Sequence, residues 1–429
     1  GRGMSHLPTD VIVYILSFVR TTHDIVAMAD MSTTMRHAVL EHLMRRCCVE
    51  WSDALSRLVK GTEQLRFEWR ELLIEPFYLK EPACLEFLLQ NYFPLLQTLK
   101  ISRWRSVRGE EGEISPSNWI RLCKFLTSHC NALESLHVDS VSVHEGGFLV
   151  DSGVSLQPSS LPRLSKIEFR RIVGNLALTP LFTCSAIADA LAYIQEFTYQ
   201  GPISRSDGSD TASLAACLAA GNRHKWRLRY LKIADAQFTL EMANQLFDLL
   251  RHCQKSLQTL DICHIYLPLH RGDVFEPLMS MEVLEACHFR RYSSLETVHT
   301  GSRDAYRYLS SNRYLCQTLR QLSVHDLCRA TCVDIAHLLL LARRLTHLDM
   351  RLCEMDPIGR RETLETLTPC WPTLHRSLIS WEMHTTGSVI HSLFPRLNRE
   401  IGPAFFPQLR EVSFPFHGLH DQHFSQHLV

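Results

Sequence analysis

Leu257-Gln-Thr-Leu260-Asp-Ile262 is one copy of a short pattern that recurs through most of this 429-residue chain. The pattern is an apolar residue, two others, an apolar residue, one other and an apolar residue. Its eleven copies start 26 to 37 residues apart. They occupy residues 96–101, 133–138, 164–169, 194–199, 228–233, 257–262, 284–289, 319–324, 345–350, 378–383 and 409–414. A recurrence at this period predicts a repeat architecture.

The residue between the last two apolar positions is polar in every copy. These residues are Lys100, His137, Glu168, Thr198, Lys232, Asp261, His288, Ser323, Asp349, Glu382 and Ser413. With 45% apolar residues in the chain, chance would produce this about once in 700 trials, so the copies alternate as half-buried strands do.

The segments between the copies have helical patterns, most clearly at residues 119–130, 184–192, 240–253 and 333–343. A strand followed by a helix, stacked repeatedly, buries the apolar strand face against its own helix and its neighbours. The sequence therefore predicts an α/β solenoid.

The copy Leu345-x-x-Leu348-x-Met350-x-x-Cys353 resembles the strand consensus of the leucine-rich repeat family. Most other copies lack the family's Asn or Cys at the last position, where Val141 and Ile265 stand in two of them. The resemblance implies a solenoid of the ribonuclease-inhibitor-like type over residues 94–429, with about eleven irregular repeats.

The first fifty residues contain no such pattern and read as three short helices. Pro8 and Asp10 suit the first turn of a helix, and an apolar stripe with a period near 3.6 follows at Val11, Ile12, Ile15, Leu16 and Val19. Asp24 is expected to cap the second helix and Ser32 the third.

Residues 5–51 resemble an F-box. The matching elements are Leu7-Pro8-x-Asp10-Val11, Ile15-Leu16-x-Phe18-Val19, Asp24-Ile25 and Met31-Ser32-x-x-Met35-Arg36. Met35 stands where family members often have Trp. The resemblance implies binding to the Skp adaptor protein, and through it to a cullin.

The expected adaptor contacts are Leu7, Pro8, Val11, Ile12, Ile15 and Leu16. The alternative for this stripe is packing against the other two helices or the first repeat. Residues 52–93 are expected to form a helical joint between the two parts, with a core filled by Trp51, Trp69, Phe77 and Phe87.

Side chains beside the buried strand positions are expected to form the binding surface of the solenoid. The candidate substrate-binding residues are Lys166, Arg170, Lys232, His288, Arg290, His325, His347 and Arg351. Because this set is basic, an acidic or phosphorylated peptide is a conceivable target. The alternative is a solvated polar face with no partner. Tyr230, near Trp226, is a candidate aromatic anchor, with packing between repeats as its alternative.

Composition excludes several classes of function. Lys plus Arg and Asp plus Glu both total 45, so the basic excess typical of nucleic-acid binding is missing. No apolar run predicts a membrane span, and fifteen scattered cysteines suggest buried thiols in an intracellular protein, cytoplasmic or nuclear. We find no motif for nucleophilic, nucleotide or zinc chemistry. The histidines His417, His420, His423 and His427 read as an exposed polar tail rather than a metal site. The chain is thus expected to be non-catalytic, with no cofactor or metal.

Together, the two resemblances suggest a substrate-recognition subunit of an SCF-type ubiquitin ligase, with partners limited to the adaptor, cullin and an unknown protein substrate. The alternative is an interaction scaffold or inhibitor, unconnected with ubiquitin, whose N-terminal helices only cap the solenoid. A receptor needs Leu7 and Pro8 exposed, whereas a cap buries them. A small-molecule-dependent receptor or an enzyme would need charged residues that converge from several repeats.

Overall fold

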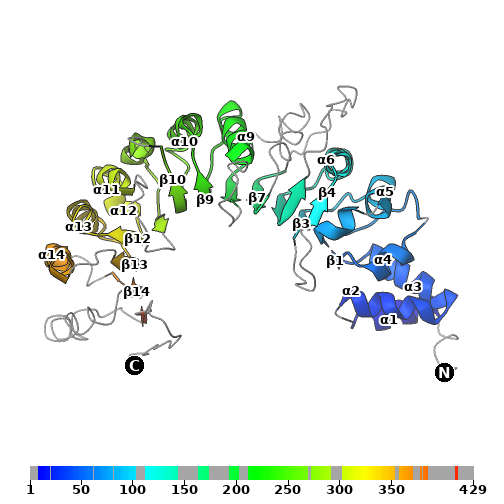
Figure 1. Ribbon diagram of the computed structural model, residues 1–429. Coiled ribbons are helices and arrows are strands. Elements are labelled where there is room, and N and C mark those ends of the chain that lie inside the picture. The colour runs from blue at the N-terminus through cyan, green and yellow to red at the C-terminus, as the bar shows by residue number, and fades with distance from the viewer. Residues whose placement is uncertain are drawn as a thin grey trace. The chain divides into compact units, whose positions relative to one another are not determined.

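The computed structural model describes residues 8–19, 21–60, 62–80, 82–102, 112–143, 163–172, 193–201, 211–268, 272–290, 302–352, 357–370, 377–378, 380–384 and 411–413. By its internal contacts the chain divides into two compact units, Gly1–Trp226 and Arg227–Val429, which are described separately (Figure 1).

The first unit begins with short helices, as the sequence predicted. They are α1 (Thr9–Leu16), α2 (Thr22–Ala27), the 3-10 turn η1 (Met28–Met31) and α3 (Thr33–Met44). Ser32 caps α3 as expected, since its hydroxyl accepts a hydrogen bond from the Met35 N–H at 3.1 Å. The cap of α2 is Thr21, however, and not Asp24. Asp24 lies inside the first turn and donates its N–H to Thr21 Oγ1 at 3.1 Å, because the helix starts three residues earlier than expected.

A parallel sheet fills the rest of the first unit. Its strands are β1 (Cys48–Glu50), β2 (Glu71–Ile74), β3 (Thr98–Ile101), β5 (Ser135–Asp139), β7 (Lys166–Arg170) and β8 (Glu196–Gln200), paired in that order. Neighbouring strands pair in parallel, for example through Leu99 with Leu136 and Leu136 with Ile167. A small second sheet pairs β4 (Gly112–Ile114) with β6 (Val141–Val143).

The second unit contains another run of parallel strands. They are β9 (Tyr230–Gln237), β10 (Thr259–Tyr266), β11 (Ala286–Arg290), β12 (Gln321–Leu327), β13 (His347–Leu352), β14 (Ser380–His384) and β15 (Glu411–Ser413). All eleven copies of the sequence pattern therefore contain a strand, and each strand starts two residues after the copy does. The prediction of an α/β fold with a repeating parallel strand is confirmed.

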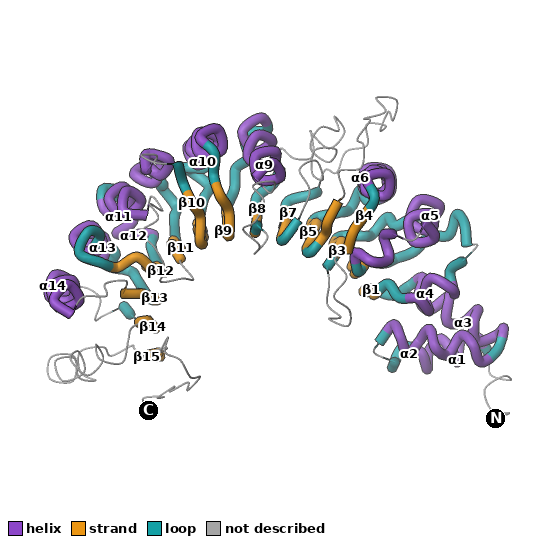
Figure 2. The backbone as a smooth tube through the Cα atoms, viewed as in Figure 1, coloured by secondary structure: helices purple, strands orange, loops and turns teal. Residues whose placement is uncertain are grey.

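Helices alternate with the strands and lie along one side of them in each unit (Figure 2). In the first unit these are α4 (Asp53–Leu58), η2 (Pro76–Lys80), α5 (Pro82–Gln90), α6 (Pro116–His129) and α9 (Thr211–Arg223). In the second they are α10 (Leu240–His252), η4 (Gly272–Ser280), α11 (Ser302–Ser310), α12 (Leu315–Thr318), α13 (Cys332–Leu341), α14 (Pro357–Leu367) and η5 (Thr368–Cys370). Three of the four predicted connecting helices are thus confirmed as α6, α10 and α13, and the fourth, at residues 184–192, lies outside the described residues.

The expectation of a purely helical joint at residues 52–93 is wrong. Strand β2 lies within this segment and pairs on one side with β1 and on the other with β3. The segment Trp69-Arg-Glu-Leu72-Leu73-Ile74 has the apolar spacing of the repeat, and Trp69, Leu72 and Ile74 are buried. It differs from the eleven copies in having the apolar Leu73 at their polar position. The parallel sheet therefore begins before the first recognisable repeat.

An aromatic cluster forms the core of this joint. Trp51, Trp69 and Phe87 are buried as predicted, and Phe67 and Phe93 join them. The ring of Trp69 lies 4.8 Å from that of Phe67, and its indole N–H donates to the carbonyl of Leu43 in α3 at 2.6 Å. This hydrogen bond ties the N-terminal helices to the start of the sheet. Phe77, predicted to belong to this core, is 49% exposed, because it lies on the outer side of the turn η2.

A left-handed residue recurs at one position of the repeat. Ser140, Arg171, Asp235 and His264 all have positive φ angles between 48° and 57°, and each is the sixth residue counted from the start of its strand. It directly follows β5 and β7 but lies within the longer strands β9 and β10. A left-handed conformation costs a residue with a Cβ roughly 1 kcal/mol or more, so its repeated use indicates one shared backbone geometry.

Two expectations about composition are also met in part. Nine of the cysteines that the structure describes are buried, whereas Cys47 and Cys48 are exposed. Among the described residues, no helix is long and apolar enough to cross a membrane.

Replacing Trp69 by Ala is expected to lower the free energy of unfolding by about 3–5 kcal/mol, because the change leaves a large cavity and orphans a buried carbonyl. Urea unfolding followed by circular dichroism measures this. Phe77→Ala is the matched control and should change the unfolding free energy by about 0.5 kcal/mol or less. Equal effects of the two substitutions would contradict the assignment of the joint's core.

Candidate functional site

The polar residues of the repeat pattern form one row across the sheet of each unit. Because the parallel strands pair in register, Lys100 lies beside His137, His137 beside Glu168, and Glu168 beside Thr198 in the first unit. In the second unit the row runs through Lys232, Asp261, His288, Ser323, Asp349 and Glu382. Alternate side chains of a strand point to opposite faces, so the row occupies the face that the helices do not cover.

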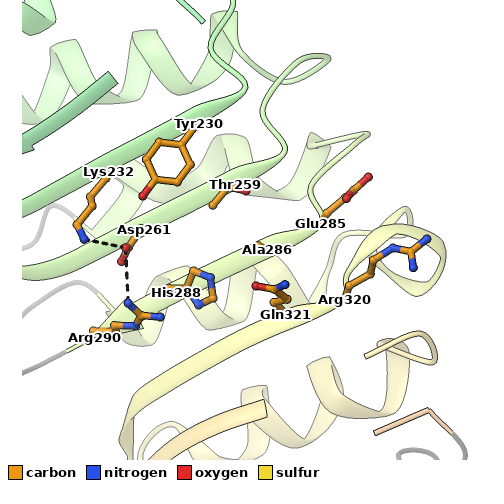
Figure 3. A pocket seen from close by; sticks show the side chains of 10 residues that line it. All are labelled: Tyr230, Lys232, Thr259, Asp261, Glu285, Ala286, His288, Arg290, Arg320 and Gln321. Atoms are coloured by element: carbon orange, nitrogen blue, oxygen red, sulfur yellow. Dashed lines mark ion pairs between the residues drawn. The ribbon is translucent and has the colours of Figure 1, made fainter. Parts of the chain in front are cut away.

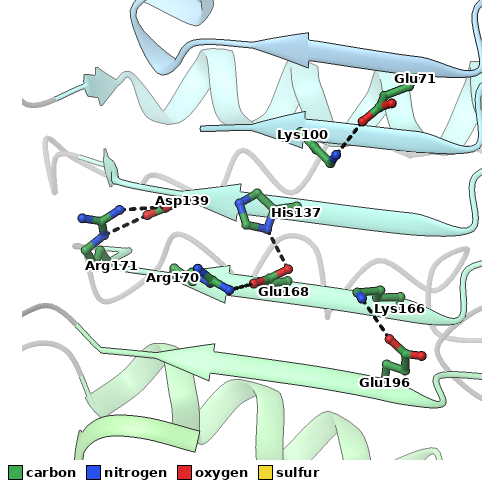
Figure 4. Close-up of polar contacts among 9 residues, drawn as sticks. All are labelled: Glu71, Lys100, His137, Asp139, Lys166, Glu168, Arg170, Arg171 and Glu196. Atoms are coloured by element: carbon green, nitrogen blue, oxygen red, sulfur yellow. Dashed lines mark hydrogen bonds and ion pairs between the residues drawn. The ribbon is translucent and has the colours of Figure 1, made fainter. Parts of the chain in front are cut away.

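In the first unit, this face is a set of closed ion pairs (Figure 4). Lys100 Nζ lies 2.5 Å from Glu71 Oε1, and Lys166 Nζ lies 3.0 Å from Glu196 Oε2. Each of these pairs joins a basic side chain of one strand to an acidic side chain of the neighbouring strand.

Glu168 is the centre of the remaining contacts on this face. It accepts from His137 at 2.9 Å and also pairs with Arg170. Burial alone would raise the pKa of Glu168, but the hydrogen bond from His137 and the charges of His137 and Arg170 lower it to about 2. The carboxylate is therefore ionised throughout the physiological range and pairs with the Arg170 guanidinium and the His137 imidazole.

A fourth pair lies at the end of the strands. Arg171 donates from Nε and Nη2 to the two carboxylate oxygens of Asp139, at 2.9 and 2.8 Å. This is the two-point geometry that makes arginine–carboxylate pairs specific. The cations of the first unit shown in Figure 4 are thus all matched by acids of the same sheet.

The second unit differs because its polar face contains a pocket of about 480 Å³ (Figure 3). Strands β9 to β12 and the residues just before them line it. The lining residues are Tyr230, Lys232, Thr259, Asp261, Glu285, Ala286, His288, Arg290, Arg320 and Gln321. This volume lies within the usual range of small-ligand sites.

Asp261 lies between two cations in this pocket. Its Oδ2 is 3.4 Å from Lys232 Nζ and 3.7 Å from Arg290 Nη1. Its side chain is only 6% exposed, and among the residues that the structure describes no group is within hydrogen-bonding distance of its other oxygen, Oδ1. These ion-pair distances are longer than those of the first unit. Asp261 therefore orients both cations but leaves them able to donate hydrogen bonds to another group.

His288 lies next to Asp261 on the neighbouring strand. Burial lowers the pKa of its imidazole, and the charges of Arg290 and Lys232 lower it further against the opposing effect of Asp261 and Asp349, to about 4. The ring is therefore neutral at pH 7, and its Nδ1 lies 2.8 Å from the Ser323 hydroxyl. It contributes hydrogen bonding but no charge to the pocket.

The eight candidate substrate-binding residues do not form one cluster. Lys232, His288 and Arg290 line the pocket, whereas His325, His347 and Arg351 belong to the second unit without lining it. His325 Nε2 instead contacts Asp349 Oδ2 at 2.9 Å. Lys166 and Arg170 belong to the first unit, where both are ion-paired.

Sequence reasoning singled out Tyr230 but did not assign Asp261, Arg320 or Gln321 to the site. The signal for Asp261 was present, since it occupies the alternating polar position of its repeat. Gln321 starts strand β12 and Arg320 directly precedes it, and only the register brings Gln321 beside Ala286.

The N-terminal helices contain the second candidate site. Of the six expected adaptor contacts, Pro8 and Val11 are exposed and Ile15 is half-buried, while Leu7 lies outside the described residues. Ile12 and Leu16 are buried, at 2% and 0% exposure. These two residues pack inside the helical unit, so the alternative interpretation is correct for them. Met35 is buried as well, and an adaptor contact by it is not supported.

A different face of α1 is apolar and exposed. Val11, Tyr14 and Phe18 are 41%, 66% and 69% exposed, and the Tyr14 and Phe18 rings meet edge to face at 5.1 Å. Met31, in η1, is 63% exposed. We call Val11, Tyr14, Phe18 and Met31 the N-terminal apolar set. Tyr14 was not among the predicted contacts, because the expected apolar stripe consists of Val11, Ile12, Ile15, Leu16 and Val19.

In the part of the chain that the structure describes, no three His, Cys, Asp or Glu side chains lie close enough together to hold a metal ion. The four histidines from His417 to His427 lie outside the described residues.

Comparison with known proteins adds no assignment. No protein-family model matches this chain, and no curated protein matches its sequence.

Replacing Glu168 by Gln should lower the free energy of unfolding at pH 7 by about 1–2 kcal/mol, since Arg170 loses its ion pair and His137 loses an ionised hydrogen-bond partner. The pKa of Glu168 is lower in the folded than in the unfolded chain. Its stabilising effect is therefore complete above the ordinary Glu pKa and is lost as the pH falls from about 4.5 to about 2.

Urea unfolding of both proteins between pH 7 and pH 3 tests this, and the gap between them should narrow on acidification. Glu196→Gln is the matched control, because that carboxylate is 46% exposed in its pair with Lys166, and it should change stability by about 0.5 kcal/mol or less. A gap for Glu168→Gln that is constant with pH would contradict this role.

Proposed function

We propose that this protein is a substrate-recognition subunit of a cullin-based, SCF-type ubiquitin ligase. The N-terminal helices act as an F-box that binds the Skp adaptor protein, and the repeats act as a leucine-rich-repeat solenoid that binds a protein substrate. The chain itself is non-catalytic and raises the concentration of substrate near the conjugating enzyme.

The observation that carries the proposal is the N-terminal apolar set. A three-helix unit that only capped the sheet would direct its large apolar side chains inward, as Ile12 and Leu16 are directed. Instead Tyr14 and Phe18 are more than half exposed one helical turn apart. Aromatic side chains in this i, i+4 arrangement are typical anchors of a helix that docks into a groove of a partner.

The order of elements supports the same function. Short helices come first, an aromatic joint fixes them through the Trp69–Leu43 hydrogen bond, and repeated strand–helix units follow. This order matches the layout expected from the two sequence resemblances. The exposure of Pro8 also agrees with a receptor, since a cap would bury it.

The second candidate function is an interaction scaffold or inhibitor unconnected with ubiquitin. The ion pairs of the first unit favour this function, because they form a charge-balanced face whose charged side chains have partners within the chain itself. The two functions differ in whether the N-terminal apolar set has a partner.

The double substitution Tyr14→Ala/Phe18→Ala should weaken binding to a purified Skp adaptor by about tenfold or more, because it removes two aromatic anchors. Co-expression followed by isothermal titration calorimetry measures this. Tyr193→Ala is the matched control, since Tyr193 is 63% exposed but lies far from α1 in the sequence, and it should leave the affinity unchanged.

Thermal melting of each variant checks that the fold is intact, which is expected because the replaced side chains are exposed. Capture of a cullin by the chain only when the adaptor is present extends the test to the ligase. If the folded parent binds no adaptor, the receptor function fails and the scaffold function takes its place.

A further inference from the structure

The pocket of the second unit has a charge arrangement that selects its occupant. Lys232, Arg290 and Arg320 supply three positive charges, while Asp261 and Glu285 supply two negative ones. His288 is neutral at pH 7 for the reasons given above. The pocket therefore has one net positive charge, which one negative charge of a ligand would balance.

The two central cations have hydrogen-bonding capacity left for that ligand. Lys232 Nζ and Arg290 Nη1 stand 3.4 and 3.7 Å from Asp261 Oδ2, which is beyond the length of a strong charged hydrogen bond. Their side chains are 27% and 34% exposed, so a ligand can reach them. Asp261 holds both groups toward the same point in Figure 3.

The second sign of a missing occupant is Asp261 itself. A buried carboxylate oxygen is costly to leave without a donor, and within the described part of the chain Oδ1 of Asp261 has none. The acids on the first unit's polar face contrast with it, because Glu168 accepts from both His137 and Arg170 and Asp139 accepts from Arg171 at both oxygens. Both carboxylate oxygens of these two acids thus have a donor, whereas one oxygen of Asp261 has none among the described residues.

We propose that the pocket binds a peptide carboxylate, whose oxygens accept hydrogen bonds from Lys232 and Arg290. A backbone N–H of the same peptide supplies the donor that Asp261 lacks. Tyr230, which is half-buried at the edge of the pocket, packs against the peptide chain.

A phosphorylated residue is the less favoured occupant. For a dianion the attraction to the cations and the repulsion by Asp261 both double, whereas the cost of removing the ligand from water rises with the square of its charge, so a dianion gains less than a monoanion from a pocket with one net positive charge. A carboxylate satisfies the two donors at the lower desolvation cost. That this pocket is the substrate site of a ligase rests on the proposed function, but the binding is a property of the chain alone.

Fluorescence anisotropy with the full chain, in the absence of any adaptor, tests the proposal. The first probe is a labelled, end-blocked decapeptide of glycine and serine with one central glutamate. The second and third probes have glutamine and phosphoserine, respectively, in place of this glutamate. The fourth probe has no acidic side chain but a free C-terminal carboxylate. The first and fourth probes distinguish a side chain from a chain end as the source of the carboxylate.

The expected result is saturable binding of a carboxylate probe that the glutamine probe does not show. Lys232→Gln, Arg290→Gln and Arg320→Gln should each weaken it by about tenfold, and the exposed position of Arg320 makes that variant safe for folding. Lys166→Gln, which removes an ion-paired lysine of the first unit, should have no effect. Asp261→Asn should strengthen binding of the phosphoserine probe severalfold, because it removes the competing carboxylate while a carbonyl oxygen remains.

Three results would overturn the proposal. They are the absence of saturable binding by either carboxylate probe, tighter binding of the phosphoserine probe than of both carboxylate probes by the parent chain, and unchanged affinity in all three pocket variants. None of them bears on adaptor binding by α1, so a failure here leaves the proposed function standing, and a failure to bind the adaptor leaves this site standing.

Discussion

Parallel pairing of the strands in register is the constraint on which the other features of this protein depend. Each repeat contributes the same strand positions, so a residue type that recurs at one position forms a continuous row across the sheet. Leu99, Leu136 and Ile167 build the apolar side of the first unit in this way. Lys100, His137 and Glu168 build its polar side. A slip of one residue would exchange the two sides, which makes the register inseparable from burial of the core.

The same constraint brings ionisable groups close together, and the two units use it differently. In the first unit, short ion pairs between neighbouring strands close the polar face. In the second unit, Asp261 lies between Lys232 and Arg290 on the two neighbouring strands, and its distances to them are 3.4 and 3.7 Å. One carboxylate for two cations leaves positive charge and an unmatched oxygen in a pocket, which are the properties of a binding site rather than of a stabilising network.

In the N-terminal helices, apolar residues that are buried and apolar residues that are exposed lie close together in the sequence. Ile12 and Leu16 fill the inside of the helical unit, while Val11 and Tyr14 in α1 and Phe18, two residues after its end, are exposed. The indole of Trp69 fixes α3 to the beginning of the sheet. The exposed aromatic pair is therefore presented by a rigid support and not by a loose terminal segment, which favours its use as a docking surface.

The sequence by itself determined the strands, because a period of two over eleven copies leaves one way to bury the leucines, and all eleven copies contain a strand. It also determined the cap at Ser32 and most of the aromatic joint, which are local or strongly apolar signals. Only the tertiary structure decided that β2 extends the sheet into the joint, that Ile12 faces inward and Tyr14 outward, and that three of the eight candidate basic residues share a pocket. The physical reason is that register, helix orientation and convergence of charges depend on contacts between segments far apart in the chain, whereas periodicity and capping depend on neighbours along it.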